Sequence, residues 1–269
     1  MPEAEEVFDL LLYRPLAFVF VKIVYRFPIT PNQITFGSML LGIGAGWSFA
    51  KGSYTAYICG GWLYAAANVL DCADGQLARL QHSGTLFGRV VDGVADYVAS
   101  VAIFLGLGFG LQAAGNPQWL FVVAAGCSGA LHAMVFDQYQ SEFISIVRGE
   151  RMFLSQEMTK FSEELERLKG GGTGRIKIVA LTLYLKYLKI QERWNGMREP
   201  SSANPDAYRR TNRHMIRLWS FLGPTTNRTL LIAASFAGRI DLYLWIVVVA
   251  GNMWLAILSL AQRRVDGSR

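Results

Sequence analysis

The chain has 269 residues, of which 52% are hydrophobic and 17% are charged, and its formal net charge at pH 7 is +6. A helix needs about 20 predominantly apolar residues to cross the hydrocarbon core of a bilayer, and several windows of this chain approach that length. An ordinary soluble domain is therefore excluded, and the composition predicts an all-α, polytopic membrane protein. No nucleic-acid partner is expected.

Residues 1–30 are predicted to form an amphipathic helix that lies in the membrane interface. Residues 10–27 are apolar, but Arg14, Lys22 and Arg26 interrupt the run. Such charges are unfavourable in the middle of a bilayer and suit a helix that lies along its surface. A seventh membrane span is the alternative. The acidic start lacks the small-residue cleavage site of a secretory signal.

Six apolar windows predict transmembrane helices. These windows are residues 34–50, 54–70, 90–113, 119–136, 216–236 and 242–260. The first four windows belong to a predicted membrane unit of residues 31–144. The last two, together with a C-terminal tail, make up residues 212–269.

Residues 145–211 separate the fourth window from the fifth and are predicted to form a helical cytosolic insert. The insert contains two charged, amphipathic runs on either side of a glycine-rich stretch, residues 170–174. This stretch lacks the spacing of a phosphate-binding loop and is interpreted as a flexible hinge. The second run suits a helix that rests on anionic lipid or on the membrane unit, and it equally suits a solvated helical hairpin.

The distribution of basic residues predicts the orientation, because cytoplasmic segments of membrane proteins are enriched in Lys and Arg. With six spans, both termini lie on the same side as the insert, and the opposite side carries only Lys51 and Arg239 of the 26 basic residues. Both termini, the insert and the active site are therefore predicted to face the cytoplasm, in a cell membrane or inner membrane.

Four aspartates, Asp71, Asp74, Asp92 and Asp96, are the only acidic residues between positions 10 and 136. Spacings of three and four residues place each pair on one face of a helix. The connection between the second and third windows is short, so the two helices should be antiparallel neighbours. All four carboxylates are then expected to converge near the cytoplasmic surface.

Four anions in an apolar setting need a cation among them. Carboxylates are hard ligands that suit Mg²⁺, Mn²⁺ or Ca²⁺, and four of them suit two divalent ions of the kind that serve phosphoryl displacement. Gly75, Gly88 and Gly93 would let a ligand approach the backbone, and Arg79 could bind a phosphate oxygen. Simple pairing with Arg79 and Arg89 would leave two of the four charges unbalanced. A cation or proton pathway is a further alternative, as is a non-catalytic membrane scaffold.

The stretch resembles the signature of the CDP-alcohol phosphotransferase (CDP-alcohol phosphatidyltransferase) family, D-x2-D-G-x2-A-R-x8-G-x3-D-x3-D. Its fixed positions are filled by Asp71, Asp74, Gly75, Ala78, Arg79, Gly88, Asp92 and Asp96. Residues 31–35 are similar to the PN-x-x-T opening of the family's first span. The six spans and the interfacial helix also resemble the family's layout, whereas the insert of residues 145–211 is not part of its usual compact form.

The resemblance implies that an alcohol attacks the β-phosphorus of a CDP-linked donor and expels CMP. Two divalent cations, Mg²⁺ or Mn²⁺, would be held by Asp71, Asp74, Asp92 and Asp96. Asp92 and Asp96 would be catalytic, with Asp96 as the general base for the incoming hydroxyl. The implied CDP site comprises Asp71, Gly75, Ala78, Arg79 and Gly88, together with Asn32 and Thr35 from the first span.

The acceptor is expected to bind near the end of the fourth window and at the start of the fifth. The candidate residues are Asp137, Gln138, Glu142, Arg151 and Arg228. Asp137 and Glu142 favour a neutral or cationic alcohol, or they form a solvated helix end. Arg228 follows a segment similar to the family's G-P-x-x-R element, where it would bind a phosphate oxygen or make an interhelical hydrogen bond.

The resemblance favours CDP-diacylglycerol as the donor and a role in phospholipid biosynthesis. The reverse arrangement, in which a CDP-alcohol donates to a lipid acceptor, stays open. Membrane lipids are expected partners, and the resemblance suggests a homodimer formed through the membrane helices.

Overall fold

A computed structural model describes most of the chain. It covers residues 1–148, 153–170, 205–267 and, between the last two ranges, positions 178, 181, 182, 185, 186 and 189. Within these residues all regular structure is helical, which confirms the predicted all-α class. The glycine-rich stretch at 171–174 and Arg151 lie outside the described residues.

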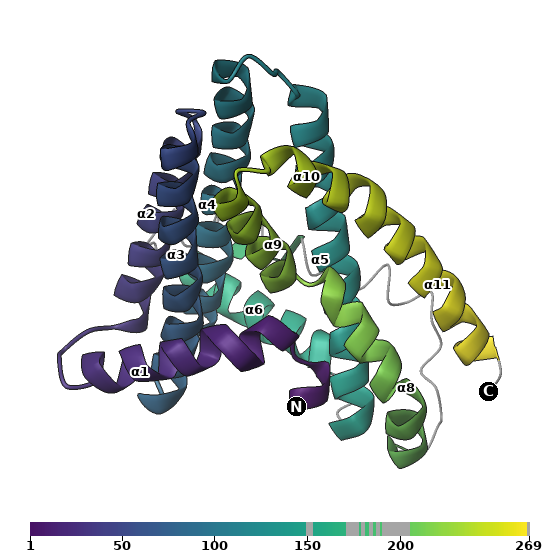
Figure 1. Cartoon of the computed structure of the whole chain (residues 1–269). Helices are drawn as coiled ribbons and strands as arrows, with labels where there is room; N and C mark the ends of the chain where they lie inside the picture. The colour runs from purple at the N-terminus through teal and green to yellow at the C-terminus, as the bar shows by residue number, and fades with distance from the viewer. Residues whose placement is uncertain are drawn as a thin grey trace.

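Ten α-helices make up most of the described chain (Figure 1). They are α1 (Arg14–Val24), α2 (Pro31–Phe49), α3 (Tyr54–Leu80), α4 (Leu86–Ala113), α5 (Trp119–Arg148), α6 (Phe153–Gly170), α8 (Pro205–Trp219), α9 (Pro224–Ala237), α10 (Ile240–Trp245) and α11 (Asn252–Gly267). Four short 3-10 or π-helical segments adjoin them: Pro2–Ala4, Asp9–Tyr13, Ser220–Leu222 and Ile246–Gly251.

Helices α2, α3 and α4 form a bundle in which small residues allow close contact. A Cβ atom on Gly46 would lie 2.3 Å from the carbonyl oxygen of Ala102, and one on Gly106 would lie 2.0 Å from the carbonyl oxygen of Gly46. Membrane helices commonly approach one another at such small residues. The glycines therefore hold α4 against α2. Because α2 also packs along α3, the two helices that carry the aspartates are held together.

Local sequence defines where the two aspartate-bearing helices begin. The Ser53 hydroxyl accepts a hydrogen bond from the Ala56 amide at the start of α3, and the Thr85 hydroxyl accepts one from the Gly88 amide at the start of α4. Side-chain oxygens at these positions satisfy amides that have no partner within the helix. The caps thereby fix the helical phase of the aspartates that follow.

Helix α1 runs crosswise to α2 and α3 and crosses the C-terminal part of α3 (Figure 1). One face, which includes Ala17 and Val21, packs against Ala73 and Leu77 of α3. The opposite face is apolar and exposed, with Leu16, Phe18, Val19 and Ile23 among its residues. This geometry suits a helix lying in the membrane plane, and its interfacial location remains a prediction.

Three described helices are long and apolar enough to cross a membrane: Phe87–Ala113, Trp119–Arg148 and Ile240–Val265. They coincide with the third, fourth and sixth predicted windows. The fifth window, residues 216–236, differs from the expected continuous helix. The chain turns at Ser220–Leu222, and Pro224 begins α9 as a new helix, because proline has no amide to continue α8. The predicted boundary at residue 211 falls inside α8.

The first part of the predicted insert packs beside the aspartates. Phe161 and Leu165 of α6 form a cluster with Val90 of α4, together with Leu181 and Leu185. The Arg89 guanidinium lies 5.5 Å from the centre of the Phe161 ring. Helix α6 therefore contacts α4 two residues before Asp92.

Candidate active site

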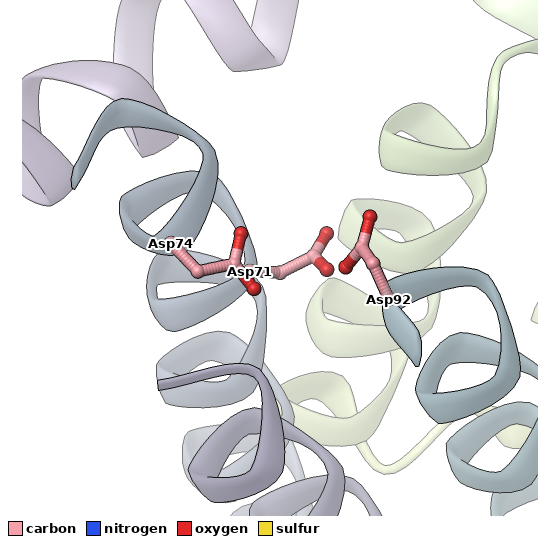
Figure 2. A group of neighbouring side chains, drawn as sticks. All are labelled: Asp71, Asp74 and Asp92. Atoms are coloured by element: carbon pink, nitrogen blue, oxygen red, sulfur yellow. The ribbon is translucent and has the colours of Figure 1, made fainter. Parts of the chain in front are cut away.

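Three aspartates converge between α3 and α4. Asp71, Asp74 and Asp92 each offer a carboxylate oxygen, and these oxygens all lie within 4.8 Å of one another. Figure 2 shows Asp71 and Asp74 projecting from one helix toward Asp92 on its neighbour. The spacing of three residues in α3 and the antiparallel approach of α4 thus bring together three of the four predicted carboxylates.

The donor set fits a hard divalent cation. Asp92 Oδ1 is buried and has no hydrogen-bond partner among the described residues. A buried carboxylate oxygen without a partner is costly, and three carboxylates this close repel one another. A cation with a preference for oxygen ligands relieves both costs. Asp71, Asp74 and Asp92 could therefore hold such an ion.

Thr35 lies behind this group, on α2. Its hydroxyl oxygen is 2.5 Å from Asp74 Oδ2 and 3.1 Å from the carbonyl oxygen of Pro31. A hydroxyl has a single hydrogen to donate, and the shorter contact indicates that it goes to Asp74. Both side chains are buried. The structure thus places Thr35, a predicted CDP-binding residue, as a support for Asp74.

Asp96 lies outside the three-carboxylate group and is paired with Arg228 of α9. Arg228 Nη2 is 2.7 Å from Asp96 Oδ2, and Nη1 is 2.8 Å from Asp71 Oδ2. The arginine side chain is 15% exposed and that of Asp96 is 42% exposed. Arg228 therefore links the aspartate pairs of α3 and α4 through a charge-assisted bridge. Arg228 was predicted either to bind a phosphate oxygen or to make an interhelical hydrogen bond, and in the structure it hydrogen-bonds from α9 to Asp71 of α3 and Asp96 of α4.

Asn68 was not among the predicted site residues. Its Oδ1 accepts a hydrogen bond of 2.9 Å from Arg228 Nη1, and its side chain is buried. Asn68 lies three residues before Asp71, so it occupies the same face of α3. A polar amide on the aspartate face of an otherwise apolar window is the signal that could have identified it.

The predicted CDP-binding residues border the same end of the bundle. The Arg79 guanidinium lies over Gly75, with Nη1 3.5 Å from the position that a Cβ would take. Asn32 Oδ1 is 3.4 Å from the corresponding position on Gly88. Ala78, between Gly75 and Arg79, is half-buried. The two glycines thus leave the backbone open beside the groups expected to bind phosphate.

Three predicted acceptor residues, Asp137, Gln138 and Glu142, lie on α5, whereas Arg228 lies on α9. Glu142 Oε1 accepts a hydrogen bond of 3.5 Å from the Tyr208 hydroxyl of α8, so this carboxylate faces the contact between α5 and α8. Asp137 and Gln138 are half-buried on the same helix. Among the acceptor candidates that the structure describes, Arg228 hydrogen-bonds to Asp71 and Asp96.

Comparisons with known proteins agree with this site. A family model described as CDP-alcohol phosphatidyltransferase matches residues 28–192, a range that includes all four aspartates. A similar protein from Drosophila melanogaster, CDP-diacylglycerol--inositol 3-phosphatidyltransferase, is 30% identical over 83 residues. That segment is 31% of this chain and 35% of the relative, so the chain matches about a third of the relative's length.

Proposed function

This chain belongs to the CDP-alcohol phosphatidyltransferase family, and we propose that it transfers a phosphatidyl group from CDP-diacylglycerol to a polar alcohol and releases CMP. The observation that carries the proposal is the group of Asp71, Asp74 and Asp92 with its unpartnered Asp92 oxygen. The name of the Drosophila relative supports CDP-diacylglycerol as donor and makes inositol the first acceptor to test. The acidic character of Asp137 also favours a neutral or cationic alcohol.

The aspartates would hold two divalent cations, Mg²⁺ or Mn²⁺. Asp71, Asp74 and Asp92 would supply the main ligands, and Asp96 would complete the site. When bound, the cations neutralise the pyrophosphate and stabilise the charge that develops on departing CMP. Thr35 orients Asp74, while Arg228 holds Asp71 and Asp96 in register across the helix pair.

The chain's own residues would then position the donor and remove a proton. Gly75 and Gly88 admit the CDP group close to the backbone, and Arg79 binds a phosphate oxygen. Asp96, whose side chain is 42% exposed compared with 23% for Asp71, accepts the proton of the acceptor hydroxyl. As that proton moves to Asp96, the hydroxyl oxygen bonds to the β-phosphorus and the bond to CMP breaks.

The membrane arrangement in this proposal follows the charge distribution of the chain. Residues 1–30 lie in the interface, and residues 31–144 contribute four spans. Helix α9 and the helix that begins at Ile240 contribute the other two, and the cytosolic insert ends before α8 (Pro205–Trp219) rather than at residue 211. Both termini and the aspartates face the cytoplasm. A homodimer formed through the membrane helices is proposed from the family alone.

The test is CMP release from CDP-diacylglycerol in detergent, with Mg²⁺ or Mn²⁺, against a panel of inositol, inositol phosphate, glycerol phosphate, serine and choline. We expect one acceptor to stimulate release and EDTA to abolish it. Asp96→Asn should remove the activity while the protein stays folded, and turnover like that of the wild type would exclude Asp96 as base.

The same assay separates the alternatives. Release of CMP from a CDP-alcohol with diacylglycerol, and none from CDP-diacylglycerol, would reverse the direction of the proposed transfer. No release from either donor class would refute the transferase proposal and leave an ion pathway or a scaffold.

A further inference from the structure

The N-terminal segment caps the helix that carries Arg228. Glu6 is 4% exposed, and its carboxylate accepts hydrogen bonds from the backbone amides of Thr225, at 3.1 Å, and Thr226, at 2.8 Å. These amides occupy the second and third positions of α9. They are the groups that an N-cap side chain normally satisfies.

Glycine at the N-cap makes this cap from a distant residue possible. Gly223 has no side-chain oxygen to offer, and a Cβ at this position would lie 2.1 Å from the carboxyl carbon of Glu6. Any other residue at 223 would collide with Glu6. The capping role that the local sequence lacks is therefore supplied by a residue more than 200 positions away, and its negative charge also suits the positive end of the helix.

Arg228 lies two residues beyond the capped amides. Tyr13 makes a second contact with the same turn, because its hydroxyl is 3.0 Å from Thr229 Oγ1. The N-terminal segment thus holds α9 on both sides of Arg228 in sequence. The Arg228 guanidinium bridges Asp71 and Asp96, and a small rotation or shift of α9 would move it out of hydrogen-bonding distance.

We infer that Glu6 is a positioning residue: by capping α9 it fixes Arg228 on Asp71 and Asp96. The effect of Glu6 on turnover rests on the proposed function, whereas its effect on the position of Arg228 beside Asp71 and Asp96 does not. Because Glu6 touches none of the aspartates in this arrangement, it acts through Arg228.

A double-mutant cycle tests the inference with two readouts, CMP release and the dissociation constant of Mn²⁺ measured by electron paramagnetic resonance. The variants are Glu6→Gln, Arg228→Gln and their combination, assayed at pH 8. Gln keeps the size of Glu but presents an amide group where one oxygen accepted a hydrogen bond. Loss of such a buried partner predicts a roughly tenfold fall in kcat for Glu6→Gln.

Coupled residues give non-additive effects, whereas independent ones add. We expect Glu6→Gln to reduce kcat less than about twofold further in the Arg228→Gln background, and to change Mn²⁺ affinity in the same direction as Arg228→Gln does. Additive losses in both readouts would overturn the inference. If CMP release were absent from the wild type, the Mn²⁺ cycle alone would still decide the inference while the proposed function failed.

Glu3 provides the matched control, because it lies in the same segment but pairs with the exposed Arg209 of α8. Glu3→Gln should leave kcat and Mn²⁺ binding unchanged. If Glu6→Gln did not fold, Glu6→Asp would replace it in the cycle. Failure of both variants to fold, with Glu3→Gln folded, would show that Glu6 serves the whole fold and would overturn its specific role.

Discussion

Replacing Thr35 with Val tests whether the residue behind Asp74 tunes the metal site. Val has nearly the same shape as Thr but cannot donate the hydrogen bond that spans 2.5 Å to Asp74 Oδ2. Both side chains are buried, with exposed fractions of 4% for Thr35 and 6% for Asp74. Water therefore has little access to replace the lost donor, and the Asp74 oxygen is left unpartnered.

The expected magnitude follows from the kind of bond that is lost. A hydrogen bond to a charged group contributes about 1.5–3 kcal/mol, and loss of the partner of a metal ligand typically weakens metal binding by about 10- to 100-fold. We expect Thr35→Val to raise the Mn²⁺ dissociation constant within that range, because Asp74 would no longer be held in orientation.

Electron paramagnetic resonance of Mn²⁺ in detergent measures this constant directly. Thr35→Ser keeps the hydroxyl and serves as the control, with an affinity near that of the wild type. A folded Thr35→Val protein that bound Mn²⁺ within twofold of the wild type would refute the reasoning, since the Thr35 contact would then have no influence on Asp74 as a ligand.

Three further predictions concern the site, the bundle and Glu6. Asp92→Asn should abolish CMP release and Mn²⁺ binding while raising the melting temperature of the metal-free protein, because one of three crowded carboxylates loses its charge. Gly106→Val should destabilise the bundle by about 3 kcal/mol or more, since a Cβ there meets the Gly46 carbonyl oxygen at 2.0 Å, whereas Gly93→Ala, with no atom within 4 Å of the added carbon, should melt as the wild type does. Burial raises the pKa of the Glu6 carboxyl from 4.5 to about 7, so the folded state binds this proton more tightly than the unfolded state. The contribution of Glu6 to the free energy of unfolding should therefore fall by about 3 kcal/mol as pH rises from 4.5 to 8. Chemical denaturation across this range should show a smaller pH-dependent loss of stability in Glu6→Gln than in the wild type, by about that amount.

The convergence of Asp71, Asp74 and Asp92 could be predicted because its signal is local. Asp71 and Asp74 lie on one helical face by their spacing alone, and the short connection to α4 forces Asp92 into the same neighbourhood. Helical spacing also placed Gly75 and Gly88 beside the carboxylates, whereas the family resemblance supplied their expected role in a CDP site. These inferences depend on helical periodicity and on the length of the connection, and both follow from residue spacing in the sequence.

Contacts between distant segments could not be read in this way. Nothing near Glu6 in the sequence indicates that it caps α9, and Thr35 gives no sign that it supports Asp74. The break at Ser220–Leu222 was also missed, because the apolar window continues through it even though Pro224 starts a new helix.

The sequence by itself determined the helical class, the apolar windows and the chemistry of a carboxylate group suited to divalent cations, because composition and periodicity act within single helices. Only the tertiary structure decided which groups share those carboxylates. It placed Arg228 and Asn68 beside Asp71, separated Asp96 from the other three, and joined Glu6 to α9. Packing between helices sets these distances, and no local sequence pattern indicates which distant residues will come into contact.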